Sequence, residues 1–193
     1  LRGWPSSCAL FEGRLWYGGA DQLAGSYSDD FTNFNVEEEG DSAPIVRSIA
    51  TGPVNKIQWM LDLARLIIGT SGAESVPRSN SFDEPMTQTN FSIKDASTYG
   101  SADVQAVKID RSGIFVHRSG KRAYDISYSI DNNDYVSSEI SRYNPSILAE
   151  GVKVMAVQRT PDTRVWFVLD DGTAACLIME KGEDVISWIT FVT

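Results

Sequence analysis

The stretch RLWYGGADQLAGSYSDDFTNFN, residues 14–35, concentrates aromatic side chains and glycines and contains no obvious catalytic group. The first six residues of this stretch, RLWYGG (14–19), form an apolar segment that leads into a turn of small residues. Three similar segments follow along the chain: RLIIGT (65–70), GIFVHR (113–118) and RVWFVL (164–169). Alignment of Leu15, Leu66, Ile114 and Val165 gives separations of 51, 48 and 51 residues. A period near 50 residues is typical of β-propeller blades with four strands each.

Each of these segments is the second strand of a predicted four-strand unit, and turn-forming Gly, Asp and Pro residues separate the strands. The first strands are CALF (8–11), KIQWM (56–60), AVKI (106–109) and VMAV (154–157). The third strands are AGSYS (24–28), AESVP (73–77), AYDISYS (123–129) and TAACLIM (173–179). The fourth strands are FNVE (34–37), NFSIKD (90–95), YVSSEI (135–140) and ISWITFV (186–192).

The sequence therefore predicts an all-β, β-propeller-like fold of about four consecutive four-stranded antiparallel blades. The blades cover approximately residues 8–37, 54–97, 104–141 and 152–193, within a single domain or fragment 1–193. One segment has an alternative interpretation, because IQWMLDLARLII (57–68) also carries apolar residues at helical spacing. We prefer the hairpin here, because the segment is in register with three others that cannot be helices.

A sheet with two apolar faces cannot bury both of them alone, so neighbouring blades must stack. The aromatic side chains would then fill the wedge between blades, while the glycines permit tight turns and close backbone approach. Four blades are the lower limit for a closed ring. We expect consecutive blades of a larger propeller, whose open first and last blades would need partners.

Composition excludes several classes of protein. The net charge of −9 argues against general affinity for nucleic acid or anionic membranes. No apolar run approaches the roughly 20 residues that a membrane span needs. Cys8 and Cys176 have no metal-like spacing, so we expect two free, mostly buried thiols, with one closing disulfide as the alternative. The chain opens without Met, which predicts a fragment of a longer protein and leaves an upstream targeting segment open.

Several motifs together carry a family likeness, from about Gly3 to Trp188. They are GWPSSCALFEGRLWYGG (3–19), GSYSDDFTNFN (25–35), VNKIQWM (54–60), LIIGTSGAE (66–74), STYGSADVQAV (97–107) and GIFVHRSGKRAYDISY (113–128). This combination resembles the tail tubular protein B, or nozzle, group of short-tailed bacteriophages. The resemblance implies a virion tail protein with a β-propeller-like region, assembled in the host cytoplasm as a ring around the DNA channel. It implies other tail proteins and copies of itself as partners, and no catalytic residue, cofactor or metal. Nozzle proteins are much larger, and their channel and gate segments are not recognisable here.

Potential catalytic motifs are weak. Residues 69–73, GTSGA, miss the nucleophile elbow G-x-S-x-G at Ala73, and the strand predicted after them replaces the required helix. His117, the one histidine, would have to act as the base for Ser71. We therefore interpret residues 69–73 as a turn and expect no enzyme activity.

Acidic clusters have structural explanations. Asp131, Asn132, Asn133 and Asp134 lack the alternation and glycine of a calcium loop and are usual turn formers. The run at 37–41, EEEGD, is interpreted as a solvated loop. The pairs Asp29–Asp30 and Asp170–Asp171 lie in predicted turns, where adjacent carboxylates do not converge as a glycosidase pair does.

Aromatic and basic residues leave two binding alternatives open. Trp16, Trp59, Trp166 and Trp188 recur at blade positions, which favours the core, and Trp4 alone lies outside that pattern. Arg118, Lys121 and Arg122 flank one turn and could contact a phosphate or an acidic partner, with a solvated hairpin tip as the default. The leading hypothesis is a structural tail component whose acidic surface lets DNA slide past without adhesion. The alternative is a carbohydrate- or peptide-binding propeller for host recognition.

Overall fold

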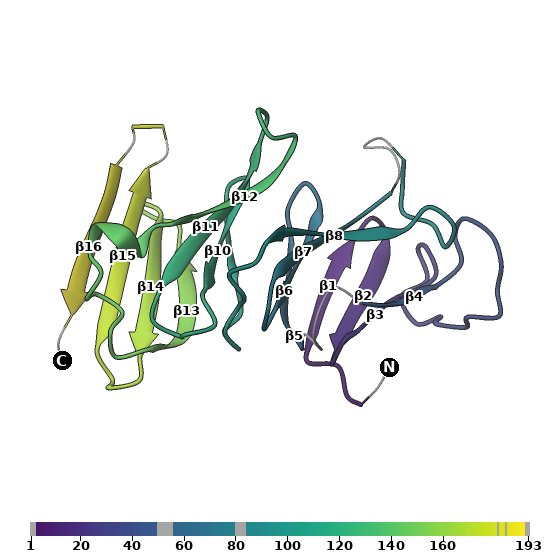
Figure 1. Ribbon diagram of the computed structural model, residues 1–193, viewed down its shortest axis with the longest axis horizontal. Helices are drawn as coiled ribbons and strands as arrows, with labels where there is room; N and C mark the ends of the chain where they lie inside the picture. Colours follow the sequence, from purple (N-terminus) through teal and green to yellow (C-terminus); the bar gives the residue numbers. More distant parts are fainter. Residues whose placement is uncertain (1–2, 50–55, 80–83, 181, 184, 192–193) are drawn as a thin grey trace. The chain divides into compact units, whose positions relative to one another are not determined.

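The computed structural model describes residues 3–49, 56–79, 84–180, 182–183 and 185–191. Within these residues the chain forms sixteen strands and one 3-10 turn. It divides into two compact units, Leu1–Gly100 and Ser101–Thr193, and each unit holds two four-stranded antiparallel sheets (Figure 1). The predicted fold class, all-β with four consecutive blade-like sheets, is confirmed.

In every sheet the strands follow one another in chain order, as in a propeller blade. The first unit contains β1 (Ser7–Phe11), β2 (Arg14–Gly19), β3 (Gln22–Gly25) and β4 (Ile45–Ser48), then β5 (Ile57–Asp62), β6 (Leu66–Thr70), β7 (Glu74–Arg78) and β8 (Ser92–Ser97). The second unit contains β9 (Val107–Ile109), β10 (Ser112–Val116), β11 (Ala123–Ser129) and β12 (Asp134–Glu139). The 3-10 turn η1 (Ser141–Tyr143) follows, and then β13 (Val152–Gln158), β14 (Arg164–Leu169), β15 (Ala174–Glu180) and β16 (Val185–Phe191).

The first sheet differs from its predicted limits, because its fourth strand is β4 and not residues 34–37. Side chains compete for the backbone there: Asn33 Oδ1 accepts the Asn35 N–H at 2.9 Å, and Asn35 Oδ1 accepts the Glu37 N–H at 3.2 Å. β4 instead pairs with β3 from Gly25↔Ile45 to Gln22↔Ser48. The first sheet therefore ends at Ser48, and a long loop separates its last two strands.

The segment 57–68 is a hairpin, so the helical alternative is wrong. β5 pairs with β6 from Ile57↔Thr70 to Asp62↔Leu66, and the Leu63 N–H donates to the Arg65 carbonyl at 3.0 Å to close the turn. Tertiary pairing overrides the local helical spacing. The end residues predicted for two sheets, Val54–Asn55 and Val192–Thr193, lie outside the described residues.

The glycines of the first unit make room for tryptophan rings on the neighbouring strand. Trp16 pairs across the sheet with Gly25, and a Cβ on Gly25 would lie 2.8 Å from the ring. Trp59 pairs with Gly69, where a Cβ would lie 2.0 Å from the ring. Both rings are fully buried. Cross-strand packing thus explains why tryptophans and glycines occur together in the two sheets of the first unit.

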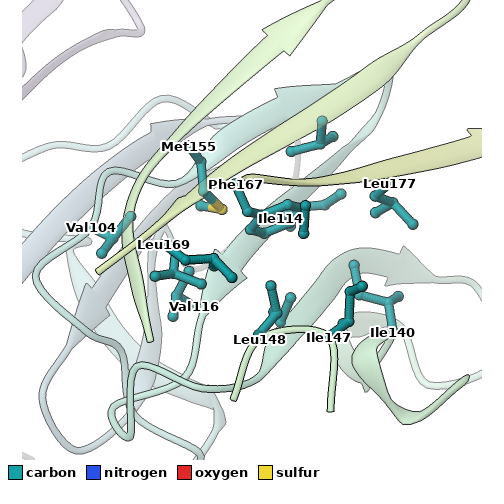
Figure 2. Close-up of a cluster of buried hydrophobic side chains, with 14 of the residues drawn as sticks. Val104, Ile114, Val116, Ile140, Ile147, Leu148, Met155, Phe167, Leu169 and Leu177 are labelled. Carbon is teal, nitrogen blue, oxygen red and sulfur yellow. The ribbon is translucent and has the colours of Figure 1, made fainter. Parts of the chain in front are cut away.

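Each unit has an apolar core of its own between its two sheets. In the first unit the core contains Trp16, Leu23, Ile45, Ile49, Ile57, Met60, Leu66, Ile68 and Met86. The Trp16 ring also stacks on Phe91 with centroids 6.1 Å apart. In the second unit, β10 and β14 face each other through Ile114, Val116, Phe167 and Leu169 (Figure 2). Ile147 and Leu148, from the connection between β12 and β13, close this core on one side (Figure 2). Burial on this scale is the main favourable free energy of folding.

A buried arginine holds both ends of the long loop between β3 and β4. Arg14 is 3% exposed. Its guanidinium donates to the carbonyls of Ser26 at 2.7 Å, Asp41 at 2.8 Å, Ser42 at 3.0 Å and Ala43 at 2.8 Å. Burial lowers the pKa of Arg14, and Glu12, Tyr27 and Asp29 oppose that shift. Guanidinium remains charged in proteins, so these are strong charge-assisted hydrogen bonds.

Gly69→Ala should destabilise the first unit, because the new methyl group would overlap the Trp59 ring. We expect a loss of about 2 kcal/mol in the free energy of unfolding, measured by urea denaturation. Gly182→Ala is the matched control, because its Cβ would meet nothing nearer than 4.0 Å. Equal stability of the two variants would contradict the packing described here.

Arg14→Met should also destabilise the first unit, because it keeps the length of the side chain but leaves four backbone carbonyls without their donor. The expected loss is on the order of 3 kcal/mol. Arg142→Met, at an exposed position, should change the free energy of unfolding by less than about 0.5 kcal/mol. Thermal unfolding with amide exchange would locate the effect in residues 26–44.

Candidate interaction surface

The fourth sheet, β13 to β16, has two apolar faces, and its own unit covers only one of them. Residues on the inner face belong to the core, among them Met155, Phe167 and Leu177. Alternate residues point the other way, because successive side chains of a strand lie on opposite faces. We call that second surface the outer face.

The strand registers define the outer face. Val154 pairs with Val168, Trp166 with Cys176, Cys176 with Ile189, and Ala174 with Phe191. The apolar side chains exposed there are Val154 (50%), Val168 (39%), Val185 (41%), Ile189 (41%) and Phe191 (42%). Contiguous exposed apolar residues of this kind mark surfaces that contact other proteins.

A tryptophan organises the middle of the outer face. The Trp166 ring packs against Phe191 with centroids 5.0 Å apart, and its Nε1 donates to Gln158 Oε1 at 3.0 Å. Cys176, the cross-strand neighbour of Trp166, is buried. An aromatic side chain with a fixed orientation is the usual centre of a protein interface.

The first sheet also has apolar residues on the face turned away from its core. Leu10 is 61% exposed and pairs with Leu15. Tyr17 lies on the same face, where Phe34 from the long loop packs on it at a centroid distance of 5.4 Å. The loop thus covers part of this face.

The turn predicted at residues 69–73 is present but shorter, because Gly69 and Thr70 end β6 and residues 71–73 connect it to β7. Thr70 Oγ1 accepts the Ala73 N–H at 3.0 Å and donates to the Ala73 carbonyl at 2.8 Å. β7 follows directly at Glu74, so the helix of a nucleophile elbow is missing at this position. Ser71 belongs to the first unit and His117 to the second. His117 Nδ1 accepts the Ser119 N–H at 3.1 Å.

The predicted acidic clusters also lie in turns and loops, apart from Asp134, which begins β12. Asn133, in the hairpin between β11 and β12, accepts a hydrogen bond from the Tyr128 hydroxyl at 2.6 Å. Asp30 Oδ1 binds the Thr32 backbone and hydroxyl. Asp171 Oδ1 binds the Thr173 hydroxyl and N–H, and these bonds lower the pKa of Asp171. In the described part of the chain, no group of three or more His, Cys, Asp or Glu residues is arranged to hold a metal ion.

The tryptophans divide largely as expected. Trp16 and Trp59 are fully buried, and Trp4 is 94% exposed. Trp188 packs against the core of the second unit and donates to the Ile140 carbonyl at 3.2 Å. Trp166 lies on the outer face, so the prediction that it is a core residue holds only in part.

Two features were not recognised from the sequence. The outer face was hidden because both alternating phases of β14 and β15 are apolar, so the pattern does not show which one is covered. The role of Arg14 could not be predicted, because the sequence shows only a charged residue beside LWYGG.

Among the described residues, no helix is long and apolar enough to cross a membrane.

Comparison with known proteins does not identify a family. No protein-family model and no curated protein matches the chain. One similar solved structure is that of a "Putative exported protein" from Bacteroides fragilis, which is 10% identical, with a TM-score of 0.44. The alignment covers 96% of this chain, which spans 58% of the length of that one. At this level of similarity the match carries no argument about function.

The two thiols should differ in reactivity. Both cysteines are free; Cys8 is exposed, contrary to the expectation of two mostly buried thiols, and Cys176 is buried. Burial raises the pKa of Cys176, with a smaller opposing effect from Arg164. Its thiolate therefore forms at a higher pH than the thiolate of an ordinary cysteine. We expect a disulfide reagent at about pH 8 to label Cys8 rapidly and Cys176 only after denaturation. Cys8→Ser should remove the fast phase, and a fast phase that survives this change would contradict the assignment.

Proposed function

We propose that this protein is a structural component that acts through protein–protein contacts rather than through catalysis. The exposed outer face of β13 to β16 is the observation that carries the proposal. Val154, Val168, Ile189 and Phe191 would be buried if another sheet stacked on them, as sheets already stack within each unit. Apolar burial contributes about 25 cal/mol per Å², so such a contact would be strongly favourable.

The partner of this face is a second copy of the protein. The first sheet carries its own exposed apolar residue, Leu10, beside Leu15 and Tyr17. Contact between the first sheet of one copy and the fourth sheet of the next joins two different surfaces. A head-to-tail contact of this kind generates a closed ring or an open filament.

A ring of copies agrees with the resemblance to nozzle proteins of short-tailed bacteriophages. In that setting the protein would be a platform of the virion tail, joined to other tail proteins around the DNA channel. Its net charge of −9 would repel the phosphate backbone and let DNA pass without adhesion. Stacked sheets would supply the stiffness that a tail tube needs.

Acidic substitutions on the outer face test the proposal. Val168→Asp and Ile189→Asp should each weaken self-association at least about ten-fold, because the interface would bury an unpaired charge. Sedimentation velocity over a range of protein concentrations measures the effect. Ile130→Asp is the matched control, since Ile130 is 87% exposed in the hairpin between β11 and β12. A wild-type protein that stays monomeric at every concentration, and is absent from virions, would refute the proposal.

A carbohydrate- or peptide-binding module is the second candidate function. The observation that favours it is Trp4, which is 94% exposed, because exposed aromatic rings can stack on sugars. Glycan-array binding that disappears with Trp4→Ala and persists with Leu10→Ala would favour this function over the structural one.

A further inference from the structure

A basic concavity occurs in the second unit of this acidic protein. Its lining residues are His117, Ser119, Lys121, Arg122, Pro145 and Ala149, around a volume of about 490 Å³. The first four belong to the turn between β10 and β11, and the last two to the connection between η1 and β13. We call this feature the basic concavity.

Backbone hydrogen bonds fix the walls of the basic concavity. The Gly120 N–H donates to the His117 carbonyl at 2.8 Å, and the His117 N–H donates to the Arg122 carbonyl at 2.9 Å. The Val152 N–H donates to the Gly120 carbonyl at 2.8 Å and ties the turn to the start of β13. The cations therefore stand on a preorganised turn, which lowers the entropy cost of binding an anion.

The positive charge of the basic concavity is only weakly compensated. Lys121 and Arg122 are exposed, and Arg122 lies 3.9 Å from Glu139, with its side chain 59% exposed. An exposed ion pair at this distance contributes little. Arg118, also exposed, adds a third cation to the same turn. A carboxylate-bearing ligand would find several donors here.

The chain carries a complementary anion of its own. Residues 37–41, EEEGD, form the densest acidic run of the sequence, and we call them the acidic loop. Glu37, Glu39 and Asp41 are exposed, and within the described residues no cation pairs with their carboxylates. The acidic loop belongs to the connection between β3 and β4, whose ends Arg14 holds through four carbonyls. Both ends of the connection that carries the acidic loop are therefore held in place by Arg14.

We propose that the acidic loop of one copy binds in the basic concavity of another. Two molecules with a charge of −9 repel each other at long range, so an electrostatic contact between them needs a local match of opposite charge. The concavity provides that match, and its uncharged wall residues, Pro145 and Ala149, let a peptide backbone approach. This inference rests on the self-association in the proposed function, and it adds a second contact that selects the register between copies.

Charge reversal on each side is the test. Variant A is Lys121→Glu with Arg122→Glu, and variant B is Glu37→Lys with Glu39→Lys. Each variant alone places like charges on both surfaces, so self-association should fall at least about ten-fold in about 50 mM salt. An equimolar mixture of A and B should restore association, because each variant then offers the surface that the other one lacks. In about 500 mM salt the differences should shrink, since screening weakens exposed charge pairs.

A matched control separates this contact from net charge. Arg111→Glu with Arg159→Glu changes two exposed cations of the same unit that lie outside β13 to β16 and alters the net charge as much as variant A does, and it should leave association close to wild type. Far-UV circular dichroism checks that every variant is folded.

Each other outcome has a definite meaning. If A, B and their mixture associate like wild type while Val168→Asp does not, the loop contact is refuted and the proposed function stands. If A and B change the thermal unfolding temperature at low salt but not the mass, the acidic loop binds within its own copy and the inference is overturned. If inorganic phosphate perturbs the amide signals of Lys121 and Arg122 while the mixture stays monomeric, the concavity is a small-anion site, and the inference is again overturned. A wild-type protein that stays monomeric at every concentration refutes the loop contact, and its absence from virions as well refutes the proposed function.

Discussion

Each sheet of this protein contributes an apolar face to the core of its unit, and the first and fourth sheets also carry exposed apolar side chains on the opposite face. The core-facing side of each sheet is buried between the two sheets of its unit. The residues packed there include Trp16, Leu66 and Ile68 in the first unit and Val116 and Phe167 in the second. Hydrophobic burial is proportional to the area removed from water, so a four-stranded sheet gains most of its stability from the sheet stacked on it. This constraint accounts for the repetition of one four-stranded unit along the chain, because each sheet needs a neighbour to cover its apolar face.

The same constraint links the fold to the proposed function. A sheet at the end of a stack leaves one apolar face uncovered, and on the fourth sheet that face is organised around Trp166 and Phe191. Apolar stacking is not directional, so it favours contact without fixing how two copies meet. Charged groups supply orientation and register. Contact between the acidic loop and the basic concavity would fix the orientation in which two copies meet through the apolar outer face.

The repeated sequence pattern determined most of the fold. Short strands with turn residues between them predicted four strands in chain order for each sheet, and the hairpin at 57–68 followed from its register with the other repeats. The aligned positions Leu66, Ile114 and Val165 are fully buried. Strand pairing is local between neighbours in chain order, which is why a one-dimensional pattern sufficed to predict it.

Tertiary structure decided what depends on contacts distant in sequence. The fourth strand of the first sheet is β4, because Asn33 and Asn35 hold the preceding segment in turns while Ile45 pairs with Gly25. Arg14 holds the loop between β3 and β4 because folding brings four carbonyls, 12 to 29 positions away in the sequence, within hydrogen-bonding distance of its guanidinium. The sequence by itself determined the strands, their order and the small-residue turns, because these rest on local chemistry. Which apolar face stays exposed and which charges converge was decided by packing between strands far apart in the chain.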